Sequence, residues 1–148
     1  MKRKVFIVTV VVFLLVCNIL LLVNFSVSSK KINYMNREND LVLLHSIGSI
    51  AQMLDDINQT PENRQIILRN ISINIGKFTN SAQFTNSNNK YTLIKLSQSF
   101  EKNFGSQIIE QYTKNEDFHK ISLLMKDLEQ NYNDTILTEK IINLLDQM

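Results

Sequence analysis

The chain has 148 residues, a formal net charge of +2 and a single cysteine, which excludes an intrachain disulfide. Five of its 16 Lys and Arg lie within the first 31 residues, so the remainder carries eleven of them against 14 Asp and Glu and is weakly acidic. This balance argues against a nucleic-acid partner, because phosphates require a clustered basic surface.

The first predicted element is a transmembrane helix at residues 5–25. This segment consists of Val, Ile, Leu and Phe, with the exceptions of Thr9, Cys17, Asn18 and Asn24. A helix rises about 1.5 Å per residue, so a segment of this length spans about 30 Å, the thickness of the hydrocarbon core of a bilayer. Three basic residues precede it, and cationic flanks tend to stay in the cytoplasm. We therefore expect residues 1–4 to be a short cytoplasmic flank and the chain after the span to lie outside the cell membrane.

Three alternatives to this anchor remain open. Ser26 and Ser28 supply the small residues of a signal-peptide cleavage site before Ser29, and cleavage there would make the protein secreted. Against cleavage, the apolar segment is longer than the roughly 7–15 residues typical of a signal peptide. Lipid attachment at Cys17 is disfavoured because a large residue precedes it and the apolar segment continues beyond it. An anchor for a cytoplasmic domain is the third alternative, because basic residues behind the span nearly balance those in front.

Residues 26–40 are predicted to form a polar stalk that leads as a helix into the next segment. In residues 41–57, apolar side chains recur at alternating steps of four and three, the spacing of one helical face. This face carries Leu43, Ile47, Ile50, Leu54 and Ile57. Thr60, Pro61 and Glu62 then indicate the start of a second helix, with Thr60 as its cap and Pro61 in its first position.

The second helix is expected at residues 61 to about 78. Its inner face carries Ile67, Leu68, Ile71, Ile75 and Phe78. The middle of this helix, NISINIG, also alternates with the period of a strand, but no other segment is a candidate strand that would pair with it. Residues 79–90 are polar and rich in Asn and Ser, so they are predicted to form a loop.

Three further helices complete the prediction. The third is expected at about residues 90–114, with a bend at Gly105. Its inner face carries Leu93, Leu96, Phe100, Phe104 and Ile108. The fourth begins at residues 115–117 and carries Phe118, Ile121, Met125, Leu128 and Tyr132. A turn at residues 131–134 leads to a terminal helix with Leu137, Ile141, Leu144 and Met148. The predicted fold is therefore all-α: a single N-terminal transmembrane helix followed by an antiparallel bundle of about four helices in residues 41–148.

No catalytic, cofactor or metal site is predicted. His45 and His119 lie nearly opposite the apolar faces of their helices, which is typical of solvated side chains. Asp55 and Asp56 are adjacent near a helix end, so their side chains diverge by about 100° and are expected to be solvated turn residues. The three glycines are too scattered for a phosphate-binding loop. We therefore expect no enzymatic activity.

Two isoleucines of the second helix are not explained by its inner face. With Ile71 at the centre of that face, Ile66 and Ile73 lie about 140° and 160° away, one above the other at i and i+7. Either this helix is central and buried on two sides, or the pair is an exposed patch for self-association or another protein. Ile66 and Ile73 are therefore the candidate partner-binding residues.

These features together predict a membrane-anchored, extracytoplasmic interaction or scaffold protein without a cofactor. Its partners would be the membrane, through one span, and another protein or further copies of itself. The alternative is a sensor-like helical domain that binds a small ligand and signals through a partner, because four residues before the span leave no output domain. The abundance of Asn, Ile and Lys is typical of AT-rich codons and indicates a bacterial or phage source.

Overall fold

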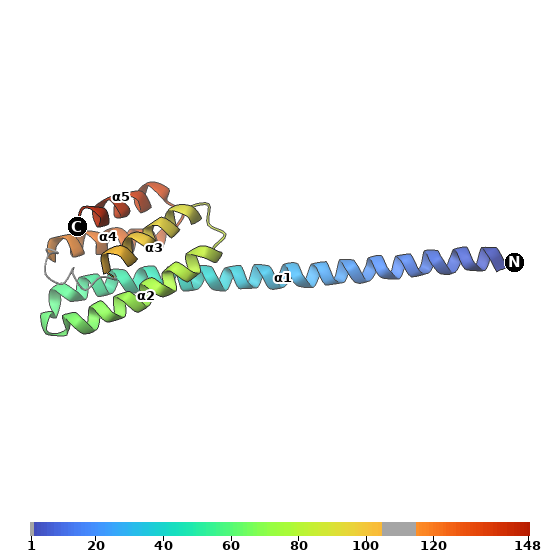
Figure 1. Cartoon of the computed structure of the whole chain (residues 1–148), viewed down its shortest axis with the longest axis horizontal. Coiled ribbons are helices and arrows are strands. Elements are labelled where there is room, and N and C mark those ends of the chain that lie inside the picture. Colours follow the sequence, from blue (N-terminus) through green and yellow to red (C-terminus); the bar gives the residue numbers. More distant parts are fainter. Residues whose placement is uncertain (1, 105–114) are drawn as a thin grey trace. The chain divides into compact units, whose positions relative to one another are not determined.

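A computed structural model describes residues 2–104 and 115–148 of the chain. The elements in chain order are α1 (Lys2–Gln59), the 3-10 turn η1 (Pro61–Asn63), α2 (Arg64–Phe84), α3 (Lys90–Phe104), α4 (Asn115–Gln130) and α5 (Thr135–Asp146) (Figure 1). Within these described residues the protein is all-α and contains no strand, which confirms the predicted fold class. The segment NISINIG lies inside α2, so its alternation does not reflect a strand.

The chain forms two compact units, Met1–Arg37 and Glu38–Met148. α1 is the one helix among the described residues that is long and apolar enough to cross a membrane, and its apolar window is not buried inside the protein. Within the first unit, Asn18 Nδ2 donates to the backbone oxygen of Leu14 at 2.8 Å. One N–H of the Asn18 amide is therefore bonded within the helix itself, which lowers the cost of a polar side chain in an apolar segment.

The second unit begins with the C-terminal part of α1, whose predicted inner face is confirmed. Its five apolar residues are at most 2% exposed, namely Leu43, Ile47, Ile50, Leu54 and Ile57. α1 ends at Gln59, where Thr60 Oγ1 donates to the backbone oxygen of Asp56 at 3.0 Å. The prediction that Thr60 caps the second helix is wrong, because its hydroxyl satisfies the end of α1. A 3-10 turn follows, and α2 begins at Arg64 instead of Pro61.

α2 continues to Phe84, beyond its predicted end near residue 78. The predicted loop at residues 79–90 is therefore wrong in its first half, and the connection to α3 comprises residues 85–89. Tertiary contacts hold the additional residues in the helix: Ser81 and Ala82 are buried, and Thr79 Oγ1 donates to Glu101 Oε1 of α3 at 2.8 Å. Packing here overrides a weak local preference for loop.

α3, α4 and α5 bury the faces that their spacing predicts. The fully buried members are Leu93, Leu96, Phe100, Phe118, Ile121, Met125, Leu128 and Ile141. Partly buried members packed against them are Phe104, Tyr132, Leu137, Leu144 and Met148. In α5 the fully buried leucine is Leu145, the neighbour of the predicted one. The predicted end of the third helix, its inward Ile108 and the bend at Gly105 lie outside the described residues.

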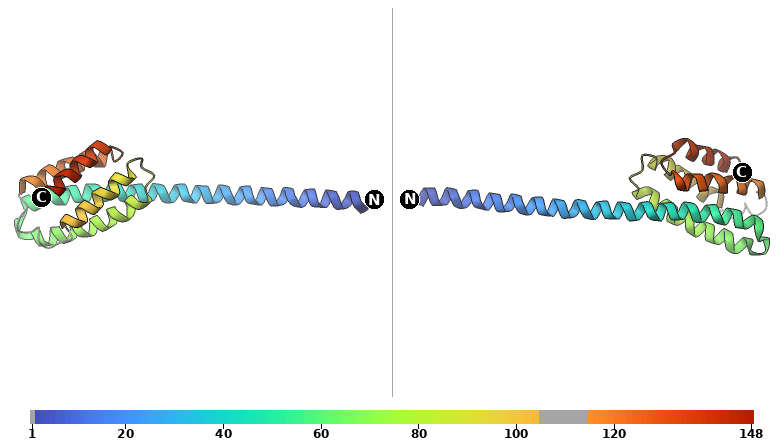
Figure 2. Two further views of the ribbon diagram at one scale, coloured as in Figure 1. Left: turned by 45° about the horizontal axis from the view of Figure 1, so that its top comes forward. Right: turned by 180° about the vertical axis from the view of Figure 1, so that it is seen from behind.

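The helices of the second unit pack around one shared core. α2 contacts α3, and α5 contacts both α3 and α4 (Figures 1 and 2). The rings of Phe100, Phe104 and Phe118 form a chain through this core, with centroids 5.7 and 5.9 Å apart. α4 approaches α1 closely where Ser122 Oγ donates to the backbone oxygen of Ala51 at 2.8 Å. Small side chains on both helices permit this approach.

Candidate interaction surface

Both candidate partner-binding isoleucines are exposed on the outer face of α2. Ile66 is 63% exposed and Ile73 is 52% exposed, whereas Ile71 and Ile75 on the inner face are buried. Burial of this helix on two sides is therefore wrong, because the other helices of the unit cover only its inner face. That a partner covers the exposed pair stays a prediction.

Phe84 extends this pair into a stripe along α2. It follows Ile66 by 18 residues, which is five helical turns, so the two side chains leave the helix in the same direction. Ile73 lies within about 20° of both, and Phe84 is 61% exposed. The sequence does not identify Phe84 as part of this stripe, because residues 79–90 locally favour a loop. Its 18-residue spacing from Ile66 is the signal that would have found it.

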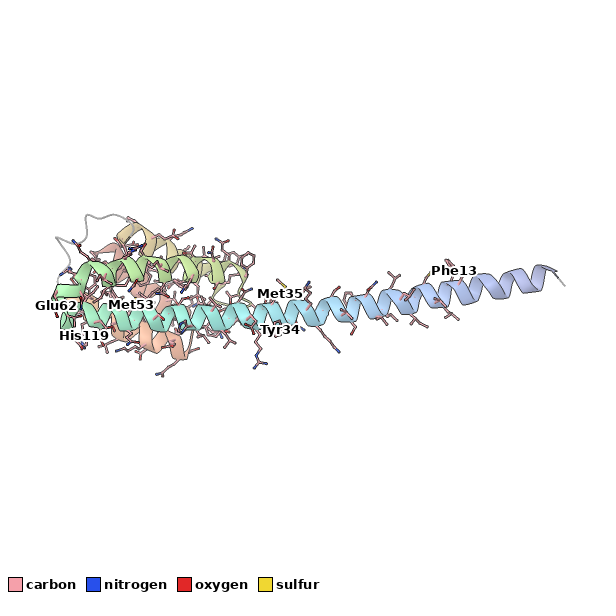
Figure 3. The ribbon with its side chains drawn as sticks, turned by 90° about the horizontal axis from the view of Figure 1, so that it is seen from below. Phe13, Tyr34, Met35, Met53, Glu62 and His119 are labelled. Atoms are coloured by element: carbon pink, nitrogen blue, oxygen red, sulfur yellow. The ribbon has the colours of Figure 1, made fainter. Side chains whose placement is uncertain are left out.

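α1 adds two exposed apolar side chains at the same end of the hairpin as Phe84. Leu41 is 54% exposed and Val42 is 42% exposed. Beside them, Thr85 Oγ1 donates to Asp40 Oδ1 at 2.5 Å and joins the two helices at this end. α1 and α2 lie side by side across the face seen in Figure 3. We call the exposed large apolar residues of these two helices from residue 38 onward the hairpin surface: Leu41, Val42, Ile66, Ile73 and Phe84.

The two hairpin helices carry most of the exposed large apolar side chains of the second unit. Among the described residues from 38 onward eight such side chains are exposed, and five of them belong to the hairpin surface. The other three, Tyr91, Leu123 and Ile136, lie one each on α3, α4 and α5. Single exposed apolar residues are ordinary, whereas a gathered set is typical of an interaction site.

Buried polar side chains in the connection between α2 and α3 fix one end of the hairpin. Asn89 Nδ2 donates to the backbone oxygen of Tyr132 at 3.0 Å and to Thr138 Oγ1 at 2.7 Å. Ser87 Oγ donates to Asn133 Oδ1 at 2.7 Å. These bonds tie the connection to the turn between α4 and α5, so the end of α2 is held in place.

A charged cluster joins the C-terminal end of α1 to α4. Asp55 Oδ2 accepts a hydrogen bond from Lys126 Nζ at 2.7 Å, and Asp55 Oδ1 lies 2.9 Å from His119 Nδ1. The hydrogen bond from Lys126, followed by that from His119, holds the pKa of Asp55 below its ordinary value, although partial burial opposes the shift. The prediction of a solvated Asp55 is therefore wrong, because α4 brings two nitrogen donors to it. His45 and His119 are exposed, as predicted.

Asp55→Asn should lower the free energy of unfolding by about 1 kcal/mol at neutral pH. Folding lowers the pKa of the Asp55 carboxyl below its unfolded value of 3.8, so the ionised carboxylate stabilises the fold at pH values above 3.8. This stabilisation is lost as the pH falls through the pKa of the folded state. The difference between parent and variant should therefore shrink below about pH 4. Urea unfolding of the full chain in detergent micelles, at about pH 7 and about pH 3, measures both effects. Asp127→Asn, at an exposed carboxyl of α4, is the control, and an equal loss in the two variants would contradict the assignment.

Two features of the described residues bear on a metal or small-ligand site. Within residues 2–104 and 115–148, no group of three or more His, Cys, Asp or Glu side chains lies close enough to hold a metal ion. A hollow of about 140 Å³ is lined by Asp117, Lys120, Leu144, Gln147 and Met148. Sites for small molecules usually occupy about 300–1,000 Å³, so this hollow is small for one.

Comparison with known proteins gives no functional assignment. Neither a family model, nor a curated protein, nor a solved structure matches the chain. The hairpin surface and the apolar N-terminal helix are therefore the features of the protein that indicate a function.

Proposed function

We propose that the protein is a membrane-anchored, extracytoplasmic helical protein that binds another protein chain through the hairpin surface and catalyses no reaction itself. Residues 5–25 form its single transmembrane anchor behind a cytoplasmic flank at residues 1–4. Residues 26–40 form the stalk, and residues 41–148 form an antiparallel bundle of about four helices outside the membrane.

The hairpin surface is the observation that carries this proposal. Fully burying an exposed apolar side chain of this size contributes about 1.5–3 kcal/mol. The five side chains of this surface are 42–63% exposed, so a partner that covered them would gain about half of that from each. Polar side chains such as Asn70, Lys77 and Asn80 stand between the apolar ones on α2. This mixed composition is typical of a protein interface, whereas a lipid-binding helix has a continuous apolar face.

The first unit supports the anchor. Large apolar side chains of residues 13–25 are exposed in the protein itself, and a bilayer would cover them. A ligand sensor is the weaker candidate, because the hollow found among the described residues, beside Met148, is small for a small-molecule site.

Ile73→Lys should abolish capture of the partner without unfolding the protein. Ile73 is about half exposed, so a lysine there keeps its charge in water and the melting temperature should change by no more than a few degrees. Capture is measured in native membranes with a photo-crosslinking amino acid at position 66 of the full chain. Ile136→Lys is the matched control, because it makes the same change at an exposed isoleucine of α5 outside the surface.

The parent and Ile136→Lys should give the same crosslinked product, and Ile73→Lys should give none. Absence of a product from the parent, or equal loss in both variants, would refute the proposed surface.

A further inference from the structure

The two helices of the hairpin carry opposite charge. Residues 38–59 of α1 contain four acidic residues and no Lys or Arg, whereas α2 contains three basic residues and no Asp or Glu. Asp55 and Asp40 already bond within the unit. Among the described residues, the remaining charges on residues 38–59 of α1 and the exposed charges on α2 form no ion pair. They are Glu38, Asp56, Arg69 and Lys77. The hairpin therefore presents an acidic edge beside a basic edge.

Hydrogen bonds between the helices determine which residues stand at the same level. At one end, Asp40 accepts from Thr85 Oγ1, and each is adjacent in sequence to an exposed apolar residue. Because α2 is antiparallel to α1, Leu41 lies at the same height along the hairpin as Phe84. The apolar ends of the two helices therefore coincide.

At the other end of the hairpin, the same register places two unpaired charged residues at the same height along the two helices. Near the middle of the hairpin, Asn74 Nδ2 lies 3.9 Å from Met53 Sδ. Counting 16 residues onward along α1 from Asp40 and 16 residues back along α2 from Thr85 places Asp56 at about the level of Arg69, and the contact near the middle agrees with this register to within about two residues. Opposite charges thus occupy one level on neighbouring helices.

Two copies can bring their hairpin faces together about a two-fold axis in two ways. A two-fold axis perpendicular to the helices places α1 on α1 and α2 on α2. Acidic residues then face acidic residues, and basic residues face basic ones. A two-fold axis parallel to the helices places α1 of each copy on α2 of the other. The acidic edge of each copy then faces the basic edge of the other copy. Only the second arrangement is electrostatically complementary.

We infer that the hairpin surface binds the hairpin surface of a second copy of this chain, with the two hairpins running in the same direction. Asp56 of each copy faces Arg69 of the other, and Leu41 of each copy meets Phe84 of the other. This inference rests on the proposed function, since it names the partner of that same surface.

The contact area suits a dimer of modest affinity. From Ile66 to Phe84 the face is about 27 Å long, and two helices about 10 Å apart make it about 20 Å wide. Pairing two such faces would bury about 1,000 Å² in total, at the low end for specific interfaces. Anchoring both copies in one membrane would raise their effective concentration and favour the dimer.

Charge exchange tests the inference directly. Asp56→Arg alone and Arg69→Asp alone each turn two attractive contacts of the symmetric dimer into two repulsive ones, so each should weaken self-association on the order of tenfold. A one-to-one mixture of the two variants should recover the parent affinity, because opposite charges again meet across the axis. Sedimentation of the full chain in density-matched detergent micelles measures the association. Glu139→Arg, on the exposed side of α5, is the control and should associate as the parent does.

The inference is overturned if the parent chain sediments as a monomer, if either single variant associates as the parent does, or if the mixture fails to recover. The crosslink from position 66 separates these results from failure of the proposed function. A product containing a different protein would refute the second copy and leave the proposed surface standing. Absence of any product would refute both.

Discussion

Phe78→Ala should lower the free energy of unfolding by about 3–5 kcal/mol, whereas Ile73→Ala on the same helix should change it by less than about 0.5 kcal/mol. The side chain of Phe78 is fully buried, so its removal loses apolar burial and leaves a cavity that the surrounding helices fill only partly. Ile73 lies on the outer face, where truncation opens no cavity. Urea unfolding of the full chain in micelles, followed by circular dichroism at low protein concentration, measures both changes.

Phe78→Ala and Ile73→Ala both introduce alanine into α2, five residues apart. A difference in helix propensity therefore does not explain a large difference between their losses of stability. Similar losses would contradict the assignment of one buried and one exposed face to α2.

Asn89→Asp should lower the free energy of unfolding by about 3 kcal/mol or more at neutral pH. Asn89 is buried, and its amide nitrogen donates to the backbone oxygens of Tyr132 and Asp134 and to Thr138 Oγ1. A carboxylate of the same shape offers no donor and places a negative charge among these oxygens. The neighbouring Asn88 is exposed, so Asn88→Asp is the control and should change stability by less than about 0.5 kcal/mol.

The loss in Asn89→Asp should become smaller in acid. Burial raises the pKa of such a carboxyl in the folded state, so its penalty is present above the folded value and disappears below the unfolded one, where both states are protonated. Urea unfolding at about pH 7 and about pH 3 measures this change. A penalty that persists unchanged at the lower pH would contradict an electrostatic cause.

Helical periodicity made the inner faces of the domain predictable. Apolar residues at alternating steps of four and three specify one side of a helix whatever the helix packs on, and the inner face of α1 shows this, since all its predicted members are buried. The turn at residues 131–134 was predictable for a similar reason. Asp134 accepts from the backbone nitrogen of Leu137 at 2.9 Å, a contact that involves only nearby residues.

The candidate surface was predictable only in part. Ile66 and Ile73 stood out because they fall outside the inner face of their helix, but their exposure was undecided. Sequence spacing says which side of a helix a residue occupies, and it does not say how many sides the neighbouring helices cover. Phe84 was hidden by the polar residues around it, which locally favour a loop.

The sequence by itself determined the all-helical class, the apolar N-terminal segment and the inner face of each described helix, because these depend on contacts within a few residues. Tertiary structure decided the features that depend on residues far apart in the chain. Burial of Ser81 and Ala82 kept the end of α2 helical, and the approach of α4 gave Asp55 its two partners. The exposure of the hairpin surface was decided in the same way, by which faces the other helices of the domain leave uncovered.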